Sequence, residues 1–248
     1  MIKTLLTTVA LSLVSFGAIA ADIPRRAAAA SPAPLFVAAD WTGVYAGVVG
    51  GYVDGKANST ATGLISFAPP SSVDLKGALV GGQVGYNHQF ANRFVLGVVA
   101  DVSWSDAKGT TCAEVGGCDG SSDDSYGEGS LSWLATARAK AGFAVNNDVL
   151  IFATGGLAMA GAKASISHLV DGNSPLVSDS QTLTGWVVGG GVEYKLSRSV
   201  SLGAEYLYAN FGKQDFNFTN AGVLGGAAIG SESDAKVNIV RVSLNYHF

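Results

Sequence analysis

The sequence predicts an all-β protein, an eight-stranded antiparallel transmembrane β-barrel with short periplasmic turns and long extracellular loops. Three observations support this prediction. Eight stretches alternate apolar with small or polar residues, the connections between them alternate between short and long, and the N-terminus carries an export signal. An even number of strands places both ends of the barrel at the short-turn rim, which faces the periplasm in bacterial outer-membrane barrels.

The first 20 residues are expected to be a cleaved signal peptide. Lys3 precedes the apolar run Leu5–Ala20, and Ala18 and Ala20 are small residues at the −3 and −1 positions of a signal peptidase site. The alternative, an N-terminal anchor helix, needs roughly 18 or more apolar residues, which this run does not supply. We expect the chain to be exported, cleaved after Ala20 and located in the cell outer membrane.

The Ala/Pro-rich residues 21–40 are expected to form a periplasmic N-terminal segment, and residues 41–248 are expected to form the barrel. Removal of residues 1–20 takes away one basic residue, Lys3, so 15 basic residues become 14 against 19 acidic ones. The formal net charge therefore falls from −4 to −5. This acidic balance argues against nucleic acid as a partner.

The stretches with a period of two are the predicted strands. They are Trp41–Val53, Leu75–Phe90, Phe94–Ser105, Leu131–Val145, Val149–Ala164, Thr182–Leu196, Val200–Asn210 and Lys236–Phe248. The tight turns among their connections are Ala91–Arg93, Asn146–Asp148 and Ser197–Ser199. The long, polar connections lie near residues 54–74, 106–130, 165–181 and 211–235. Short turns at one rim and long loops at the other are typical of outer-membrane barrels.

Each strand has one apolar face, which is expected to contact lipid. In Leu131–Val145, for example, Leu131 and Trp133 begin the apolar face, whereas Arg138 and Lys140 lie on the opposite face. The apolar faces carry aromatic residues at their ends and aliphatic or small residues between, which is typical of a lipid-facing band between aromatic girdles. The predicted girdle residues are Trp104, Trp133, Trp186 and Tyr208 near the loop rim, and Trp41, Phe90, Phe143, Tyr194, Tyr246 and Phe248 near the periplasmic rim.

Six charged residues lie on the polar phase of their strands and are expected to face the lumen. They are Asp101, Arg138, Lys140, Glu193, Glu205 and Arg241. These acids and bases should form ion pairs, because unpaired buried charges are strongly destabilising. The interior of an eight-stranded barrel is just wide enough for side chains to fill, which favours a packed plug over a narrow water-filled path. The same charges disfavour a soluble lipocalin-like barrel. Lys195 is left out of the network and expected at the periplasmic rim.

No catalytic residue, metal site or cofactor is expected. The chain has three histidines, of which His88 and His247 lie near periplasmic strand ends and His168 lies in a predicted loop. They are accompanied by neither a G-x-S-x-G nucleophile motif nor the ligand spacing of a metal site. We therefore predict that the protein is not an enzyme.

The second long loop contains both cysteines of the chain. Cys112 and Cys118 bracket Ala113–Gly117, and export to an oxidising compartment favours a disulfide between them over two free thiols. The loop is acidic, and weak binding of a divalent cation is the alternative to plain solvation. It lacks the ordered ligand spacing of a calcium loop, so no metal site is assigned.

Several segments together carry a family resemblance. They are Ala21–Arg26, Trp41–Gly47, Gly81–Asn87, Ala153–Ala158 and Gly189–Tyr194. With them, the chain resembles the small outer-membrane surface proteins of alphaproteobacteria, a porin-like, opacity-type family of eight-stranded barrels similar in architecture to the OmpA transmembrane domain. Leu244, Tyr246 and Phe248 at the end of the last strand also resemble the signal read by the barrel-assembly machinery, which is an expected partner.

The resemblance implies a non-enzymatic barrel that contributes to envelope integrity and displays its loops as surface antigens. Outer-membrane lipids and lipopolysaccharide are the expected partners in the membrane. Two alternatives remain: a low-conductance porin for small solutes, and a receptor that binds haemin or host molecules through its loops. Haem has little support, because His168 is the one loop histidine and haem iron needs a placed axial ligand.

Overall fold

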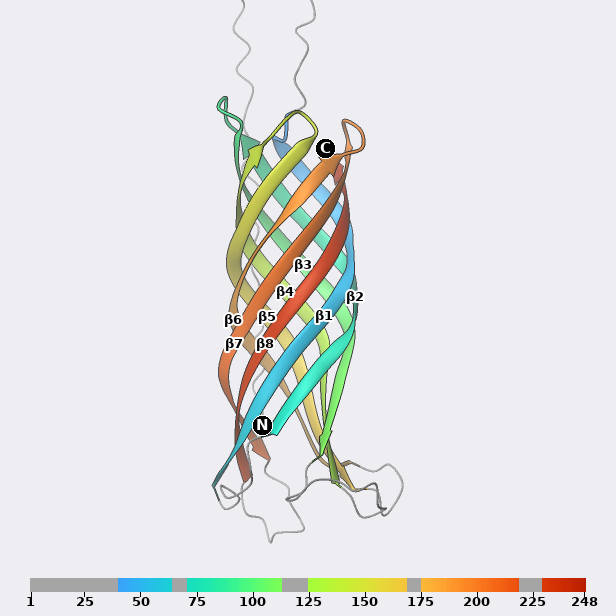
Figure 1. The fold of residues 1–248 in the computed structure, drawn as a ribbon, viewed down its shortest axis with the longest axis vertical. Coiled ribbons are helices and arrows are strands. Elements are labelled where there is room, and N and C mark those ends of the chain that lie inside the picture. Colours follow the sequence, from blue (N-terminus) through green and yellow to red (C-terminus); the bar gives the residue numbers. More distant parts are fainter. Residues whose placement is uncertain (1–39, 64–70, 113–124, 169–174, 219–228) are drawn as a thin grey trace, which may run out of the picture. The chain divides into compact units, whose positions relative to one another are not determined.

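The computed structural model describes residues 40–63, 71–112, 125–168, 175–218 and 229–248, which form a closed antiparallel β-barrel (Figure 1). The strands are β1 (Gly43–Gly63), β2 (Ser71–Gln89), β3 (Phe94–Cys112), β4 (Ser125–Ala144), β5 (Val149–His168), β6 (Pro175–Lys195), β7 (Val200–Phe218) and β8 (Ile229–His247). Each pairs with its neighbours in sequence, and β1 closes the barrel against β8. The predicted fold class is confirmed.

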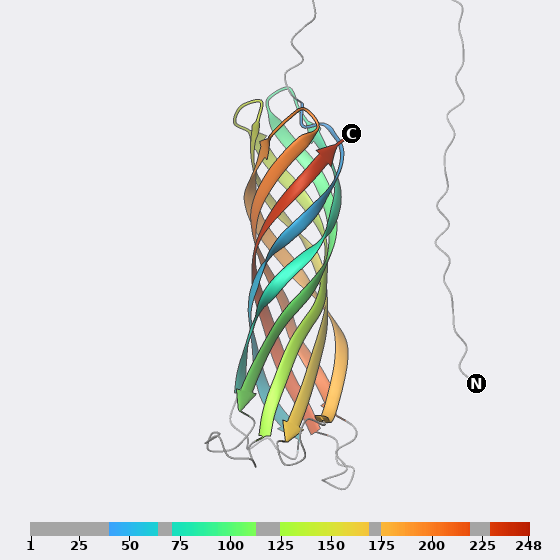
Figure 2. The same cartoon turned by 90° about the vertical axis from the view of Figure 1, so that its right-hand side faces the viewer.

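The three tight turns lie where they were predicted, and all three are at the end of the barrel that also holds the C-terminus (Figure 2). No helix among the described residues is long and apolar enough to cross a membrane. The predicted signal peptide and residues 21–39 of the predicted N-terminal segment lie outside the described residues.

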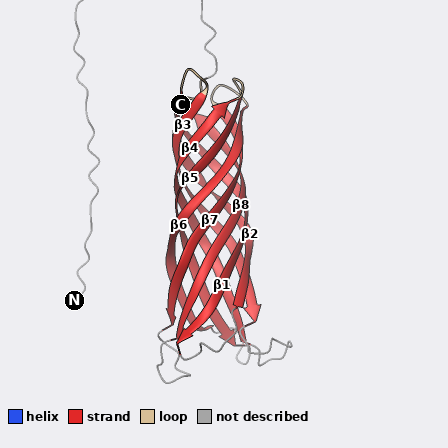
Figure 3. Cartoon of the chain, turned by 60° about the vertical axis from the view of Figure 1, so that its left-hand side comes forward, coloured by secondary structure: helices blue, strands red, loops and turns tan. Residues whose placement is uncertain are grey.

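The strands are longer than predicted. They span 19 to 21 residues, so most of what was expected as long loops continues the barrel wall (Figure 3). Pairing of β1 with β2 reaches Ser59 and Ser71, and pairing of β7 with β8 reaches Phe218 and Ile229. A strand of about 20 residues extends about 66 Å, and a tilt of about 40° leaves a height of about 50 Å, roughly twice the apolar band of an outer-membrane barrel. The loop-side part of the wall therefore continues well beyond such a band.

Two bulges reverse the inside–outside alternation near the loop end. In β4 the bulge lies between Leu131 and Trp133, so Leu131 points inward and is 3% exposed. The prediction that Leu131 shares the outer face with Trp133 was wrong, because it assumed unbroken alternation. In β7 the bulge lies between Asn210 and Lys213, and its Gly212 has a positive φ of 63°.

The inside of the barrel is layered. A loop-side apolar plug receives residues from all eight strands: Val53, Leu79, Ala107, Leu131, Leu134, Ala158, Ala160, Leu183, Val187, Leu207, Ala209, Phe211, Val237 and Ile239. A smaller turn-side cap consists of Trp41, Val95, Ala144 and Leu150 with Phe152 against them. The charged residues lie between these two apolar layers.

Candidate functional site

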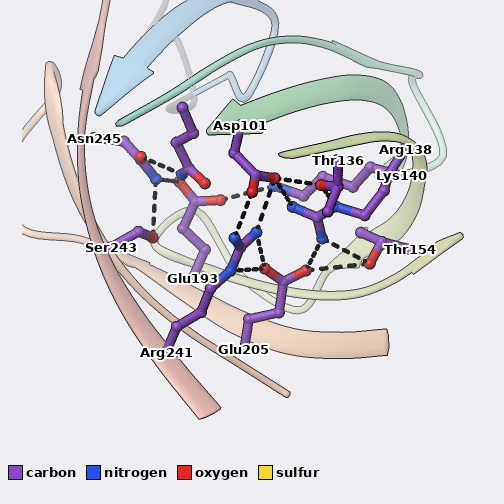
Figure 4. Close-up of polar contacts among 11 residues, drawn as sticks. Asp101, Thr136, Arg138, Lys140, Thr154, Glu193, Glu205, Arg241, Ser243 and Asn245 are labelled. Carbon is purple, nitrogen blue, oxygen red and sulfur yellow. Dashed lines mark hydrogen bonds and ion pairs between the residues drawn. The ribbon is translucent and has the colours of Figure 1, made fainter. Parts of the chain in front are cut away.

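Four charged residues from four strands meet at the middle of the lumen (Figure 4). Arg138 on β4 lies between Asp101 on β3 and Glu205 on β7, with nitrogen–oxygen distances of 2.9 and 2.5 Å. Arg241 on β8 contacts the same two acids at 2.9 and 2.8 Å. These residues form a ring of alternating charge that we call the four-residue network.

Two threonines complete the hydrogen bonding of the four-residue network. Thr136 donates to Asp101 and accepts from Arg138 Nε, and Thr154 bonds both Arg138 and Glu205 (Figure 4). The side chains of Asp101, Arg138 and Arg241 are at most 2% exposed, and that of Glu205 is 11% exposed. Two positive and two negative groups cancel, so the network is electrically neutral where solvent is nearly excluded.

A second cluster lies nearer the short turns. Lys140 Nζ is 2.8 Å from Glu193 Oε2, and the ammonium lies 4.2 Å from the centre of the Phe152 ring. The other Glu193 oxygen accepts from Ser201 Oγ at 2.5 Å and from Asn245 Nδ2 at 3.0 Å. We call this cluster the Lys140–Glu193 pair.

The space for these side chains comes from small inward residues on the neighbouring strands. The ring of Tyr45, which is 2% exposed, occupies the place where a side chain at Gly85 would begin. Gly191 makes room for the Phe152 ring in the same way. A cavity of about 20 Å³ remains beside Lys140, Glu205 and Asn245, enough for about one water molecule.

Ser201, His247 and Glu193 form a grouping that the sequence analysis did not single out. Ser201 Oγ lies 2.8 Å from His247 Nε2, and Nε2 is also 3.5 Å from Glu193 Oε1. In a Ser-His-acid triad the acid holds the other ring nitrogen, whereas here Glu193 bonds the serine itself. Ser201 is also fully buried, so a substrate has no access to its hydroxyl. The signal that could have found this grouping is the inward phase that all three residues share.

The structure corrects the prediction for Trp41 and places Lys195 beside its ring. Trp41 was assigned to the aromatic girdle, but its side chain is 0% exposed and lies inside the barrel. It shares the inward phase of Tyr45, which the alternation before β1 already implied. Lys195 was left out of the charge network and expected at the periplasmic rim, and it does end β6 at the short-turn end of the barrel. There it is buried, donates to the carbonyl of Asp40 at 2.7 Å and lies 4.6 Å from the Trp41 ring.

The other predicted girdle and terminal residues point outward. Trp104, Phe143, Trp186, Tyr194, Leu244, Tyr246 and Phe248 are exposed on the outer surface. Trp133 is half-buried and faces Trp104 across β3 and β4, and Tyr208 packs on Trp186 with ring centres 5.6 Å apart. The outer face thus carries aromatic rings toward the loops and toward the short turns, as in a membrane barrel.

The remaining predicted positions lie at the loop end. Cys112 ends β3 and is disulfide-bonded, whereas Cys118 lies outside the described residues. His168 ends β5 and does not lie in a loop. Within the described ranges, no cluster of three or more His, Cys, Asp or Glu side chains could hold a metal ion.

Comparisons with known proteins agree with this geometry. Residues 10–248 match the family described as outer membrane protein beta-barrel domain. The 31 kDa outer-membrane immunogenic protein of Brucella melitensis is 31% identical over 248 residues, covering 96% of each chain. The 22 kDa outer membrane protein of Rhizobium leguminosarum is 28% identical over 190 residues, 76% of this chain and 72% of the relative. The outer membrane protease OmpT of Escherichia coli is similar in fold alone, with a TM-score of 0.54, 8% identity, and coverage of 83% of this chain and 97% of that one.

Proposed function

We propose a function from one premise: this chain belongs to the family of outer-membrane β-barrel proteins, and it resides in the outer membrane. Within that family we propose a non-enzymatic, non-conducting barrel. Its role is to reinforce the envelope and to hold the four loop segments at the cell surface. The short-turn end then faces the periplasm and the loop end faces outward.

The packing of the lumen carries this proposal. An ion that entered from the loop end would meet the loop-side apolar plug, to which every strand contributes. It would then meet the neutral four-residue network, and finally the Lys140–Glu193 pair and the turn-side cap. Dehydrated ions do not cross apolar layers without a large cost, so we expect the barrel to be closed.

Surface display is supported by the relatives and by the shape of the wall. The Brucella relatives are named immunogenic proteins, which is consistent with loops that antibodies reach. The loop-side half of each strand carries those loops away from the membrane surface. The proposal that the barrel is non-enzymatic is supported by the grouping of Ser201, His247 and Glu193. Ser201, the candidate nucleophile, is fully buried and donates its hydroxyl to Glu193.

Single-channel recording tests the closed lumen. Protein purified from outer membranes is reconstituted into a planar bilayer, beside Arg138→Ala and the double variant Leu134→Ser/Leu207→Ser. We expect no conductance from the wild type or from Arg138→Ala, because the apolar plug stays intact in both. The double variant hydrates the plug, and we expect occasional small openings from it. Reproducible steps from the wild type would overturn the proposal in favour of the porin.

A further inference from the structure

The outer surface of the barrel has a row of lysines on the loop side of the aromatic girdle. Lys76 on β2 lies directly opposite Lys108 on β3 in the strand register. Lys108 lies opposite Ser130 on β4, and Ser130 lies opposite Lys163 on β5. All three lysines are exposed, so one face of the wall carries three positive charges in a single cross-strand row.

These lysines have no acidic partner within the part of the chain that the structure describes. No carboxylate oxygen there comes within 4.0 Å of the Nζ of Lys76, Lys108 or Lys163. Asp54 lies opposite Lys76 on β1 without reaching it, and the Asp106 carboxylate accepts the backbone N–H of Ala78 at 2.7 Å.

A second lysine pair, on the neighbouring strands β1 and β8, provides an internal contrast. Lys56 on β1 lies opposite Lys236 on β8, again on the outer surface. Each of these lysines has its own acid: Lys56 lies 3.6 Å from Asp74, and Lys236 lies 2.9 Å from Asp234. Like charges that face each other across two strands destabilise a sheet. At Lys56 and Lys236 the carboxylates of Asp74 and Asp234 neutralise this repulsion. At Lys76 and Lys108 the described residues provide no such carboxylate, so the repulsion between the two ammonium groups remains.

The position of the row indicates which kind of anion would lie beside it. Trp104 and Trp133 face each other on β3 and β4. Trp104 lies four residues closer to the short turns than Lys108, and Trp133 lies three residues closer than Ser130. Tryptophan rings of membrane barrels lie at the headgroup level. From Trp104 to Lys108 the strand rises about 13 Å along its length and about 10 Å along the barrel axis. The flexible lysine side chains can therefore reach the charged layer that the outermost lipid headgroups form.

We propose that Lys76, Lys108 and Lys163 form a binding site for the anionic headgroup of lipid A, the anchor of lipopolysaccharide in the outer leaflet. The site rests on the outward orientation of the loop end given under the proposed function. Three ammonium groups in a row provide charge-assisted donors for the acidic groups of one glycolipid headgroup, and the Trp104–Trp133 pair below them packs against its acyl chains.

The test compares two matched double variants of the protein purified from outer membranes in detergent. Lys76→Gln/Lys108→Gln removes two charges from the proposed site. Lys56→Gln/Lys236→Gln removes two charges from outer-surface lysines that already have acidic partners. Binding of purified lipopolysaccharide is measured at several salt concentrations. We expect the first variant to lose about tenfold or more in affinity and to lose most of its salt dependence, and the control to change by less than about twofold.

Other outcomes overturn the proposal. Equal losses in the two variants would mean general attraction to a basic surface, and wild-type affinity in the first variant would mean that the row binds no lipid. Binding of a soluble sulfated polysaccharide in place of lipopolysaccharide, lost in the first variant, would assign the row to a different ligand. Folding of each variant is checked by heat-modifiable gel mobility. Conductance of the wild type is a separate measurement, so failure of the closed-barrel proposal is distinguishable from failure of the lipid site.

Discussion

At the scale of single residues, Arg138 has the most demanding position in the lumen. Its guanidinium reaches Asp101, Glu205, Thr136 and Thr154 at once. Only a planar group with five donors can satisfy two acids and two hydroxyls from one point. Loss of Arg138 would leave Asp101 and Glu205 to share Arg241 alone.

We therefore expect Arg138→Ala to lower the free energy of unfolding by about 3–5 kcal/mol, because it leaves buried negative charge without compensation. Arg138→Lys should lie between this variant and the wild type, since it keeps the charge but not the fork of donors. Urea unfolding followed by heat-modifiable gel mobility measures both. Arg198→Ala in the exposed turn after β6 is the matched control and should leave unfolding unchanged. If Arg138→Ala unfolded at the same urea concentration as the wild type, we would conclude that water, and not buried ion pairs, surrounds the Arg138 side chain in the native protein.

The inward phase of all six lumen charges followed from the sequence, whereas their partners did not. Alternation decides which face a residue occupies, but register and shear decide which strand it meets. Arg138 meets Asp101 and Glu205, while Lys140, only two residues away, meets Glu193 instead. Trp41 was misplaced for another reason: it was judged by residue type, although its phase already pointed inward.

At the scale of strands, the loop-side halves were the hardest part to predict. Period-two patterns are visible where one face is apolar and the other polar. Beyond the aromatic girdle the outer face carries charged residues such as Lys56 and Lys108. Several inward positions there are small, such as Gly55, Ala57 and Gly109, so the apolar face is harder to recognise in the sequence. The backbone ladder continues because each N–H and C=O in a closed barrel finds its partner on the next strand whatever the side chain.

The bulge at Gly212 allows a test of what the bend in β7 requires of the backbone. It occupies the β7 bulge with a φ of 63°, and a Cβ at this position would meet no atom within 4 Å. Any cost of Gly212→Ala must therefore come from the backbone, and a left-handed conformation costs about 1–2 kcal/mol for an ordinary residue. Gly212→Asn should cost less, because asparagine tolerates this conformation. The same unfolding assay measures both, and an alanine variant as stable as the wild type would show that the bulge can relax.

At the scale of the whole molecule, the charged layer defines which side of the wall is inside. The loop-side plug is apolar and the lipid-facing surface is apolar, so hydrophobicity alone does not distinguish the two faces of these strands. A slip of one residue would move Arg138, Lys140 and Arg241 into lipid, where each cation near the bilayer midplane costs about 2–4 kcal/mol. The buried charges thus penalise every inverted register, even if apolar residues in their place would pack equally well.

The same layering predicts how the barrel stands in the membrane, and cysteine labelling on whole cells tests it. Val48→Cys lies on the outer face within the apolar band, Asn58→Cys lies on the same face of β1 beyond it, and Arg198→Cys lies in a short turn. The background is low, because the described residues include no free cysteine.

A maleimide too large for porins should label Asn58→Cys on intact cells, because this part of β1 extends into water. Arg198→Cys should react only after the outer membrane is opened, since its turn faces the periplasm. Val48→Cys should stay unlabelled until the protein is denatured, because lipid covers it. If Arg198→Cys but not Asn58→Cys reacted on intact cells, the barrel would have the opposite orientation. The lysine row would then not lie at the outer leaflet. Protection of both Asn58→Cys and Val48→Cys would contradict this placement. The membrane would then cover the wall beyond the aromatic girdle and bury Lys76, Lys108 and Lys163 in lipid, where charged side chains are costly.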